Sequence, residues 1–409
     1  MIHMKIQNFK RVLPILLLFV PIVLFFKPVF FGEIPIAADA LVGLYHPWRD
    51  SVAETYPNGI PVKNPLITDP IRQQYPYREL GISEIKKGEM PLWNPYSFSG
   101  TPLFANPQAG ILNPFNIIFF VLPFAQGWTV LLMLQFIIGA CGLYLYLRNL
   151  NLDARAAVLG SLSFVFSGFF IAWFTWGTIG YVIGALPWIL LAADKLIAKF
   201  QFRWVFVLIF FESLVLLAGH PQTALYVLIF STVYVIGRIL EKKKTITQIG
   251  KKLILFGVTA SVVLGIVSVQ LIPVFKFIML SARDFDLTKW DRPDWFLPWA
   301  HLVQIIAPDF FGNPVTRNDW FGYYAEWASF VGIIPVMLAA FSLHRKVDKR
   351  VLFFCSAAIV VLILGVDSQL QKIVGSLHIP VISTSTSSRI IVLLSFSLAI
   401  LSGFGLERV

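Results

Sequence analysis

Cysteine is almost absent from this chain of 409 residues. Its two cysteines, Cys141 and Cys355, both fall inside apolar segments, so the sequence implies no disulfide framework. Charged residues are also scarce, at 13% of the chain. The sequence has no Cys/His cluster with metal-ligand spacing, no glycine-rich phosphate-binding loop and no heptad repeat. These absences argue against a disulfide-stabilised domain, a zinc domain, a P-loop nucleotide-binding protein and a coiled coil.

Long apolar runs dominate what is present. Hydrophobic residues make up 57% of the chain and the mean hydropathy is +0.74, which is outside the range of soluble proteins. Crossing a bilayer takes about 20 apolar residues in a helix. The chain is therefore predicted to be an all-α polytopic membrane protein with about ten transmembrane helices, at 12–31, 127–147, 156–173, 180–197, 204–219, 222–239, 253–275, 327–343, 350–366 and 389–406. A shorter apolar run, 113–123, predicts a re-entrant or interfacial segment.

The predicted helices leave two large polar loops, 32–107 and 276–325, within a single transmembrane domain that covers residues 1–409. The first loop is far longer than a link between two helices requires, so we expect it to have a structure of its own. Lys27 and Pro28 follow the first apolar run without a small-residue cleavage site, which favours an uncleaved helix over a signal peptide. The chain stops at Val409, directly after an apolar segment, and we interpret it as part of a longer protein.

The distribution of Lys and Arg predicts the orientation in the membrane. Five short segments carry net charges between +1 and +5, whereas the two large loops carry −2 and −1. The N-terminus is therefore predicted to be cytoplasmic and the large loops extracytoplasmic. The net charge of +11 is a topology signal and predicts no nucleic-acid partner, because the basic residues lie in separate short linkers. These linkers are 1–11, 148–155, 194–203, 238–252 and 344–350.

The first loop contains two related phrases, in which an aspartate precedes a tyrosine by six positions. Asp39 precedes Tyr45, and Asp69 precedes Tyr75. A small internal duplication could explain the pair, and the sequence leaves this open. The loop then continues with Pro91-Leu-Trp93-Asn94-Pro95-Tyr96-Ser-Phe-Ser-Gly100-Thr-Pro102.

The stretch 88–102 resembles the YfhO-type family of bacterial membrane proteins, and its Pro-Leu-Trp-Asn-Pro-Tyr is the most specific part of the match. The resemblance extends over nearly the whole chain. It implies the C-type glycosyltransferase (GT-C) fold, in which a many-helix bundle carries a catalytic carboxylate in its first outer loop. It also implies transfer of a sugar from a polyprenyl-phosphate carrier to a cell-envelope acceptor, at a bacterial-type cytoplasmic membrane. Further similar stretches are 69–78, 105–108, 219–226, 308–312 and the last apolar segment from Arg389.

The family pattern has one acidic residue soon after the first helix, but this chain has two candidates, Asp39 and Asp69. Glycosyl transfer to a hydroxyl needs a base, and a carboxylate can accept the proton. Asp39 follows the first helix closely and should lie near the membrane surface, whereas Asp69 reaches that place only if the loop folds back. The structural alternative for each is a helix or turn cap, and Asp69 before Pro70 fits a helix start especially well. Both aspartates remain candidate catalytic residues.

Arginines are the candidates for binding the donor phosphate, because a planar guanidinium can donate two parallel hydrogen bonds to it. The candidates are Arg49, Arg78 and Arg389. Arg389 lies at the start of the last apolar segment, at a depth that suits a lipid headgroup. The alternative for Arg389 is that it extends along the helix to the membrane interface.

Six other residues complete the candidate substrate-binding set. Trp93 could stack on a sugar ring, since the prolines and glycine around it fix its backbone. His220 and Gln222 lie in a short turn that could equally be only a tight connection. Glu326 ends the second loop, where it could bind substrate or a divalent cation, or be a solvated flank. No cofactor is predicted with certainty. The six are Trp93, Asn94, Gln108, His220, Gln222 and Glu326.

Two other functional classes fit parts of this pattern. One is a transporter or flippase of lipid-linked saccharides, and the other is a non-catalytic protein of envelope assembly. A transporter should have paired polar groups in matched halves of the membrane domain, but Glu212 is a single acidic residue within a predicted helix. Glu212 can also be explained as a hydrogen-bonded structural group. The concentration of polar residues in the outer loops favours the glycosyltransferase.

Overall fold

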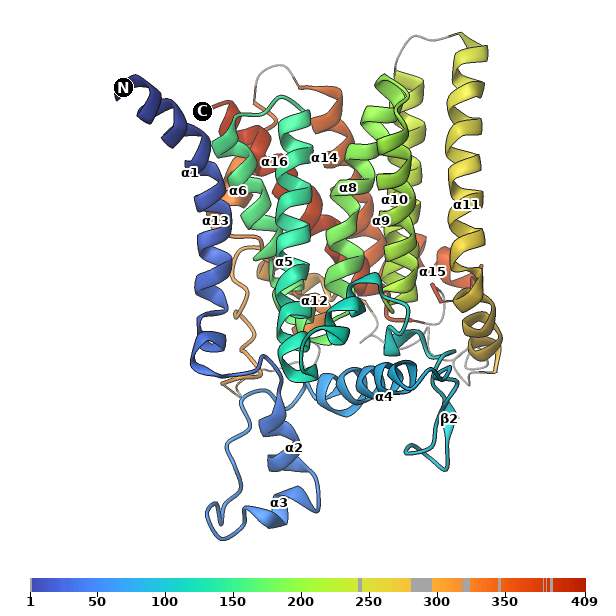
Figure 1. Cartoon of the computed structure of the whole chain (residues 1–409). Helices are drawn as coiled ribbons and strands as arrows, with labels where there is room; N and C mark the ends of the chain where they lie inside the picture. Colours follow the sequence, from blue (N-terminus) through green and yellow to red (C-terminus); the bar gives the residue numbers. More distant parts are fainter. Residues whose placement is uncertain are drawn as a thin grey trace.

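The computed structural model describes residues 2–241, 245–280, 296–316, 318, 324–344, 347–377, 379, 381–382 and 385–409, with the backbone alone for 2–12. The long helices form a bundle with both chain termini at one end, and the first loop extends from the other end (Figure 1). We call the latter the loop end. The bundle helices are α1 (Ile2–Phe25), α5 (Phe124–Asn149), α6 (Ala154–Val165), α7 (Gly168–Trp173), α8 (Ile179–Ala198), α9 (Phe202–Leu217), α10 (Pro221–Glu241), α11 (Ile246–Met279), α13 (Ile333–Phe341), α14 (Lys349–Gly365) and α16 (Val392–Glu407).

Each of the ten predicted apolar segments contains helix, but not every helix has the length of a membrane span. Within the described residues, five helical segments are long and apolar enough to cross a bilayer, and a sixth is formed if α6 and α7 with the turn after it count as one span bent by 43°. The five are α5, α8, α10, α11 and the segment Ser387–Glu407. The chain is thus a membrane-embedded helical protein. The remaining apolar helices, α1 within Leu13–Phe25, α9, α13 and α14, are shorter.

Side-chain caps fix where several helices begin. Asp153 accepts a hydrogen bond from the backbone N–H of Arg155 before α6, at 2.7 Å, and Asp348 accepts one from Arg350 before α14, also at 2.7 Å. Thr245 caps α11 in the same way. Each cap satisfies a backbone donor that the first turn of a helix leaves unpaired.

The most buried helix is α8, which packs against α5, α9 and α10. Glycines allow α5 and α8 to approach closely, because a Cβ atom at Gly184 would lie 3.4 Å from the Cα of Gly139. The Trp188 indole of α8 stacks on Phe211 of α9 and donates to the carbonyl of Ile138 at 2.9 Å. On the other side of the core, α16 packs against α6, α13 and α14. At one edge of the bundle, α11 contacts mainly α9 and leaves most of its surface exposed.

Short elements make up the first loop, and α4 lies across the loop end of the bundle (Figure 1). A π-helix, η2, runs directly into α4, and a two-stranded antiparallel hairpin pairs Trp93 with Pro102. The 3₁₀-helix η4 occupies the run that was predicted to be re-entrant or interfacial. The elements of this region are η1 (Lys27–Phe31), α2 (Ala38–Leu44), α3 (Trp48–Ser51), η2 (Pro70–Gln74), α4 (Tyr75–Lys86), β1 (Trp93–Asn94), β2 (Thr101–Pro102), η3 (Pro107–Ala109) and η4 (Pro114–Phe120).

Later short elements also lie near the loop end (Figure 1). Of the second predicted loop, 276–325, residues 281–295, 317 and 319–323 lie outside the described part. The backbone N–H of Leu297 donates to the carbonyl of Gly365 at 2.8 Å and joins this region to α14. The elements are η5 (Phe174–Trp176), η9 (Trp299–Ile305), α12 (Tyr324–Trp327), α15 (Gln369–Ser376) and η10 (Ser387–Ile391).

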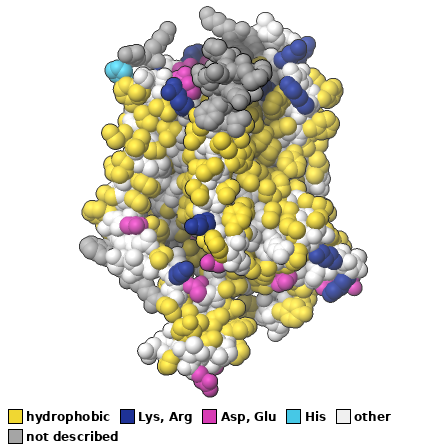
Figure 2. Space-filling model, turned by 60° about the vertical axis from the view of Figure 1, so that its left-hand side comes forward, with side chains coloured by type: hydrophobic (Ala, Val, Ile, Leu, Met, Phe, Trp, Pro, Cys, Tyr) yellow, Lys and Arg dark blue, Asp and Glu magenta, His cyan; other side chains and the backbone are white. Residues whose placement is uncertain are grey.

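The surface agrees with a membrane environment. Figure 2 shows hydrophobic side chains across the middle of one face, with most of the charged side chains toward the two ends. A continuous apolar zone on a soluble protein would be exposed to water at a large cost in free energy, whereas lipid accepts it.

Candidate functional site

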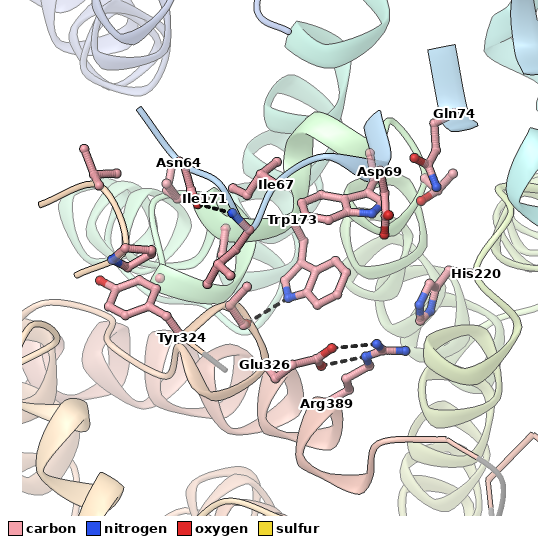
Figure 3. Close-up of a pocket in the computed structure, with 18 of the residues that line it drawn as sticks. Asn64, Ile67, Asp69, Gln74, Ile171, Trp173, His220, Tyr324, Glu326 and Arg389 are labelled. Carbon is pink, nitrogen blue, oxygen red and sulfur yellow. Dashed lines mark hydrogen bonds and ion pairs between the residues drawn. The ribbon is translucent and has the colours of Figure 1, made fainter. Parts of the chain in front are cut away.

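A polar pocket of about 520 Å³ lies at the loop end, where the first loop, the turn before α10, α12 and η10 meet (Figure 3). Its wall combines carboxylate, guanidinium, imidazole and amide groups with two tryptophans. Such a wall suits a ligand with charged and polar groups. The lining residues are Asn64, Leu66, Ile67, Asp69, Gln74, Gln108, Gly168, Ile171, Ala172, Trp173, Trp176, Thr178, His220, Asn313, Pro314, Val315, Tyr324, Ala325, Glu326 and Arg389.

Arg389 and Glu326 form an ion pair with two parallel hydrogen bonds. Arg389 Nε donates to Glu326 Oε2 at 2.7 Å, and Nη2 donates to Oε1 at 2.6 Å. Only 19% of the Arg389 side chain and 14% of the Glu326 side chain are exposed. The pair joins α12 to η10 and fixes the orientation of both groups. Arg389 is therefore held inside the protein instead of extending along the bundle surface.

Two further contacts hold the Arg389 guanidinium. Its Nη1 donates to Gln222 Oε1 at 3.2 Å, and Gln222 Nε2 in turn donates to the carbonyl of Thr386 at 2.8 Å. The guanidinium carbon lies 5.1 Å from the centre of the Trp173 ring, within the range of a cation–π contact. Within the described residues, three of the five N–H donors of this guanidinium are used, which leaves two for a ligand.

Asp69 lines the pocket and lies at the start of η2. Its carboxylate does not cap that helix, and it makes no hydrogen bond within the described part of the chain. Figure 3 shows Asp69 on one side of the pocket and the Glu326–Arg389 pair on the other. The negative charge of Asp69 interacts electrostatically with Arg389. The capping role that the sequence offers as an alternative is therefore wrong for Asp69, and its carboxylate is available to a ligand.

Amide and imidazole groups complete the polar wall. Gln74 Nε2 donates to Gln108 Oε1 at 3.2 Å, which joins η2 to η3, while the buried Gln74 Oε1 has no partner among the described residues. His220 Nδ1 accepts a hydrogen bond from the backbone N–H of Thr223 at 3.3 Å, so the ring proton of a neutral His220 is on Nε2. His220 thus serves the turn before α10 and lines the pocket as well.

Arg78 is fully buried behind the pocket wall and does not line the pocket. Its Nε donates to the carbonyl of Ala109 at 3.3 Å and its Nη1 to the carbonyl of Gly177 at 3.2 Å. The guanidinium lies 5.6 Å from the Trp128 ring centre. Burial lowers the pKa of Arg78 to about 10, so the group stays charged at neutral pH. Gly110 is required beside it, because a Cβ atom there would lie 2.2 Å from Arg78 Nη2.

Asp39 and Arg49 lie in the part of the first loop that projects from the bundle, and neither lines the pocket. Asp39 Oδ2 accepts a hydrogen bond from the backbone N–H of Lys63 at 2.8 Å, which ties α2 to the returning chain. Arg49 is exposed on α3. Asp39 therefore stabilises the fold of the loop, and it does not line the pocket that contains Arg389.

Trp93 and Asn94 lie in the hairpin, outside the pocket. The Trp93 ring packs over Gly100, where a Cβ atom would lie 2.4 Å from it, yet 54% of Trp93 is exposed. Asn94 is buried: its Oδ1 accepts from the backbone N–H of Tyr96 at 2.9 Å, and its Nδ2 donates to Ser97 Oγ at 3.2 Å. Asn94 therefore shapes the turn, and Trp93 presents an aromatic face to the solvent.

Several pocket residues were not among the predicted site residues. Tyr324 donates a hydrogen bond to Asp309 Oδ1 at 2.5 Å, and burial together with this carboxylate raises the pKa of Tyr324. Asn313 Nδ2 donates to the same oxygen at 3.1 Å. Asp309 belongs to a phrase that carries the family resemblance, so a signal existed for this cluster. Gln74 had a similar signal, since it lies between Asp69 and Tyr75 of the second phrase.

An apolar groove of about 530 Å³ runs beside the polar pocket, between α10 and α14. Ser387 and Ile390 of η10 line it, so Arg389 of the pocket lies between two residues of the groove. Its other lining residues are Tyr226, Ile229, Phe230, Val233, Phe353, Ser356, Ala357, Val360, Val361, Leu364, Gln371, Val374, Leu377, Ile379, Ile382 and Leu393.

The fold brings together five of the predicted site residues as pocket lining, and a sixth through its bond to Arg389. The five are Asp69, Gln108, His220, Glu326 and Arg389, and the sixth is Gln222. Within the described ranges, no group of three or more His, Cys, Asp or Glu side chains could hold a metal ion. Comparisons with protein-family models, with curated proteins and with solved structures find no match for this chain.

Proposed function

We propose that this chain is a membrane glycosyltransferase, which moves a sugar from a polyprenyl-phosphate-linked donor to a hydroxyl group of a cell-envelope acceptor. One observation carries the proposal: Arg389 of the polar pocket and two residues of the apolar groove belong to the same short helix, η10. A polyprenyl-phosphate sugar contains a lipid chain, a phosphate and a polar sugar, which correspond to these three parts of the site. The groove would hold the chain, Arg389 the phosphate and the pocket the sugar.

The state of Arg389 suits a phosphate that must bind and then leave. Glu326 already balances its charge, so the donor phosphate would be held by the two remaining N–H groups and not by a full unpaired charge. Trp173 supports the guanidinium from one face. Moderate binding of this kind allows the carrier phosphate to dissociate after the sugar has been transferred.

Asp69 is our choice for the base. The acceptor oxygen attacks the anomeric carbon while its proton passes to the Asp69 carboxylate. The bond between the anomeric carbon and the phosphate oxygen breaks, and its electron pair remains on the phosphate, which Arg389 stabilises by hydrogen bonding. A single displacement of this kind inverts the configuration at the anomeric carbon. The absence of a hydrogen-bond partner for Asp69 within the described residues supports the choice over Asp39.

The charge distribution supports an arrangement with the loop end outside. The linkers rich in Lys and Arg lie away from the first loop, as the positive-inside rule requires of cytoplasmic segments. We therefore propose a bacterial-type cytoplasmic membrane, with the polar pocket open to the extracytoplasmic side. Donor, acceptor and bilayer would then be the partners.

Purified protein in nanodiscs, given a radiolabelled polyprenyl-phosphate sugar and cell-envelope acceptors, tests the proposal. Asp69→Asn keeps the size of the side chain but cannot take a proton, so transfer should fall by about 10² to 10⁴-fold while donor binding persists. Asp39→Asn is the matched control, since it changes the same residue type in the same loop. It should keep transfer within a few-fold of the parent if the protein remains folded.

Two results would count against the proposal. If Asp69→Asn transfers sugar at the parent rate, Asp69 is not the base. If the parent protein moves labelled donor across a vesicle membrane but never breaks the sugar–phosphate bond, the transporter class is correct instead. Equal loss in both variants would point to a structural effect of the loop.

A further inference from the structure

A second apolar cavity lies between α9, α10 and α11, and we call it the α11 recess. It has a volume of about 250 Å³. Among the residues that the structure describes, its lining is apolar except for one glutamine and contains no charged group. The lining residues are Pro107, Leu216, Leu217, Pro221, Ala224, Leu225, Leu228, Gln270, Leu271, Val274, Phe275, Ile278 and Val381.

The glutamine is the informative member of the α11 recess. Gln270 is only 3% exposed, and its Oε1 has no hydrogen-bond partner in the part of the chain that the structure describes. A buried amide oxygen without a donor is costly, so a ligand that donates a hydrogen bond there would gain that bond. The neighbouring Leu271 packs against a cluster formed by Leu217 of the last turn of α9 with Val263 and Val267 of α11. Gln270 is therefore near the loop end of α9. Leu225 and Leu228 of α10 lie deeper in the bundle, whereas Val274 and Ile278 of α11 lie closer to the loop end.

The α11 recess and the apolar groove lie on opposite faces of α10. Tyr226, Phe230 and Val233 of α10 line the groove, whereas Ala224 and Leu228 line the recess. At about 100° per residue these residues point in nearly opposite directions, whereas Ile229 of the groove and Leu225 of the recess are only about 40° apart around the helix. The helix α10 thus separates two apolar cavities, and both are lined by residues of its apolar segment.

The α11 recess also shares a wall with the polar pocket. Pro107 and Pro221 line the recess, while their sequence neighbours Gln108 and His220 line the pocket. At this wall the chain passes close to itself: a Cβ atom at Gly219, whose φ is +106°, would lie 2.6 Å from the carbonyl oxygen of Pro107. A lipid in the recess would therefore have its headgroup beside the pocket.

We propose that the α11 recess binds the lipid anchor of the acceptor, and this inference rests on the glycosyltransferase function proposed above. The anchor belongs to a neutral lipid with two hydroxyl groups, one on the anchor itself and one on the headgroup, which accepts the sugar in the polar pocket; diacylglycerol represents the anchor with its single hydroxyl. The anchor hydroxyl donates to Gln270 Oε1, and the chain lies along Leu225 and Leu228. Among the described residues no cation lines the recess, in contrast to the groove beside Arg389, and this favours a neutral anchor over a phosphate headgroup.

Photocrosslinking with a diazirine-labelled diacylglycerol in nanodiscs tests binding. The crosslinks should saturate and map to peptides of α10 and α11. Leu228→Trp fills the α11 recess and should lower the yield about tenfold, whereas Ala357→Trp, which fills the apolar groove, should leave it unchanged. In the parent, a probe whose hydroxyl is methylated should bind about fivefold more weakly, the effect of one neutral hydrogen bond, and Gln270→Leu should abolish that preference.

A transfer assay tests the role of the lipid as acceptor anchor. With radiolabelled donor and cell-envelope membranes, the labelled product should partition into a detergent phase, and Leu228→Trp should lower transfer about tenfold without changing donor binding. Crosslinks that Leu228→Trp leaves intact, or a product that is entirely water-soluble, would overturn the inference. If the parent transfers no sugar at all, the proposed function fails, and saturable crosslinking would then identify a lipid site without an acceptor role.

Discussion

Asp69 and Asp39 occupy equivalent positions in two similar phrases but have different environments. The Asp39 carboxylate accepts a backbone hydrogen bond from Lys63, while that of Asp69 faces the polar pocket without a hydrogen bond among the described residues. Local sequence cannot separate the two, because the difference comes from what the loop packs against. Asp69 follows a segment that folds back onto the bundle, and Asp39 lies in the projecting part of the loop.

Arg389 and Glu326 should affect donor binding in opposite directions. Arg389→Ala removes the N–H groups that would hydrogen-bond to the phosphate, so binding of polyprenyl phosphate should become about tenfold weaker or more. Glu326→Gln leaves the arginine charge unbalanced, so binding should become tighter by a similar factor and carrier release slower. Equilibrium binding in nanodiscs measures both. If both changes weaken binding equally, the pair serves only to hold α12 against η10.

His301 should make the stability of the protein depend on pH. Burial against Phe311 and Trp327 lowers its pKa below the usual value of 6.5, although a hydrogen bond with Gln304 opposes the shift. The unfolded chain then binds a proton more readily, so stability is complete above pH 6.5 and decreases as the pH falls through the lower folded pKa. Melting temperatures at pH 7.5, 6.0 and 5.0 test this. His301→Gln should show a smaller decrease over that range, and an identical slope would contradict the prediction.

At the residue level, the sequence predicted which side chains would be useful but not how they are connected. Arg389, Gln222 and Glu326 were each predicted to bind substrate. Their mutual bonds span 63 and 167 positions of the chain, and such contacts leave no local pattern. Arg78 illustrates the opposite case. Its residue type predicted phosphate binding, but the structure encloses it between Ala109 and Gly177.

Among the helices, apolar periodicity located the segments but not their breaks. The segment 156–173 was predicted as one helix, whereas α6 ends at Val165 and α7 begins at Gly168. Ser167 caps α7, and the N–H of Gly168 donates to the carbonyl of Phe330 at 2.7 Å. The serine–glycine pair was a readable cap signal. The bond to Phe330 was not predictable, because it depends on how a distant segment packs.

The apolar groove gives a prediction for α14. Ala357→Trp should fill the groove and weaken donor binding about tenfold, since the lipid chain loses contact area. Leu352→Trp is the matched control, because Leu352 belongs to the same helix but does not line the groove. Binding of a polyprenyl-phosphate sugar in nanodiscs measures the effect. Equal binding by the two variants would exclude the groove as the site of the chain.

For the whole molecule, hydropathy and charge predicted a polytopic helical bundle with its large polar loops at one end. The structure shows a helical bundle with the first loop at one end (Figure 1). In the part of the chain that the structure describes, five or six helices have the length and apolar character of a span, compared with the ten predicted, because a run such as 327–343 contains the short helix α13 and no long one. The fold of the first loop could not be predicted in detail. Its hairpin and its π-helix depend on contacts with the bundle, for which the hydrophobic pattern carries no signal.

Orientation gives a prediction at this scale. In a variant without Cys141 and Cys355, single cysteines at Ser83 and Thr316 should react with an impermeant thiol reagent added to intact cells, since both lie at the loop end. A cysteine at Thr245, which caps α11 at the opposite end, should react only after the cells are opened. Reaction at Thr245 in intact cells would reverse the topology.

The position of α10 between the apolar groove and the α11 recess has a consequence for how the reaction would depend on the surrounding bilayer. Because the two cavities use opposite faces of one helix, filling one does not block the other. Two amphiphiles diffusing in the plane of the membrane would load from different sides and in either order. The rate should then saturate independently with the surface density of each lipid. A shared entrance would instead produce inhibition by whichever lipid is in excess.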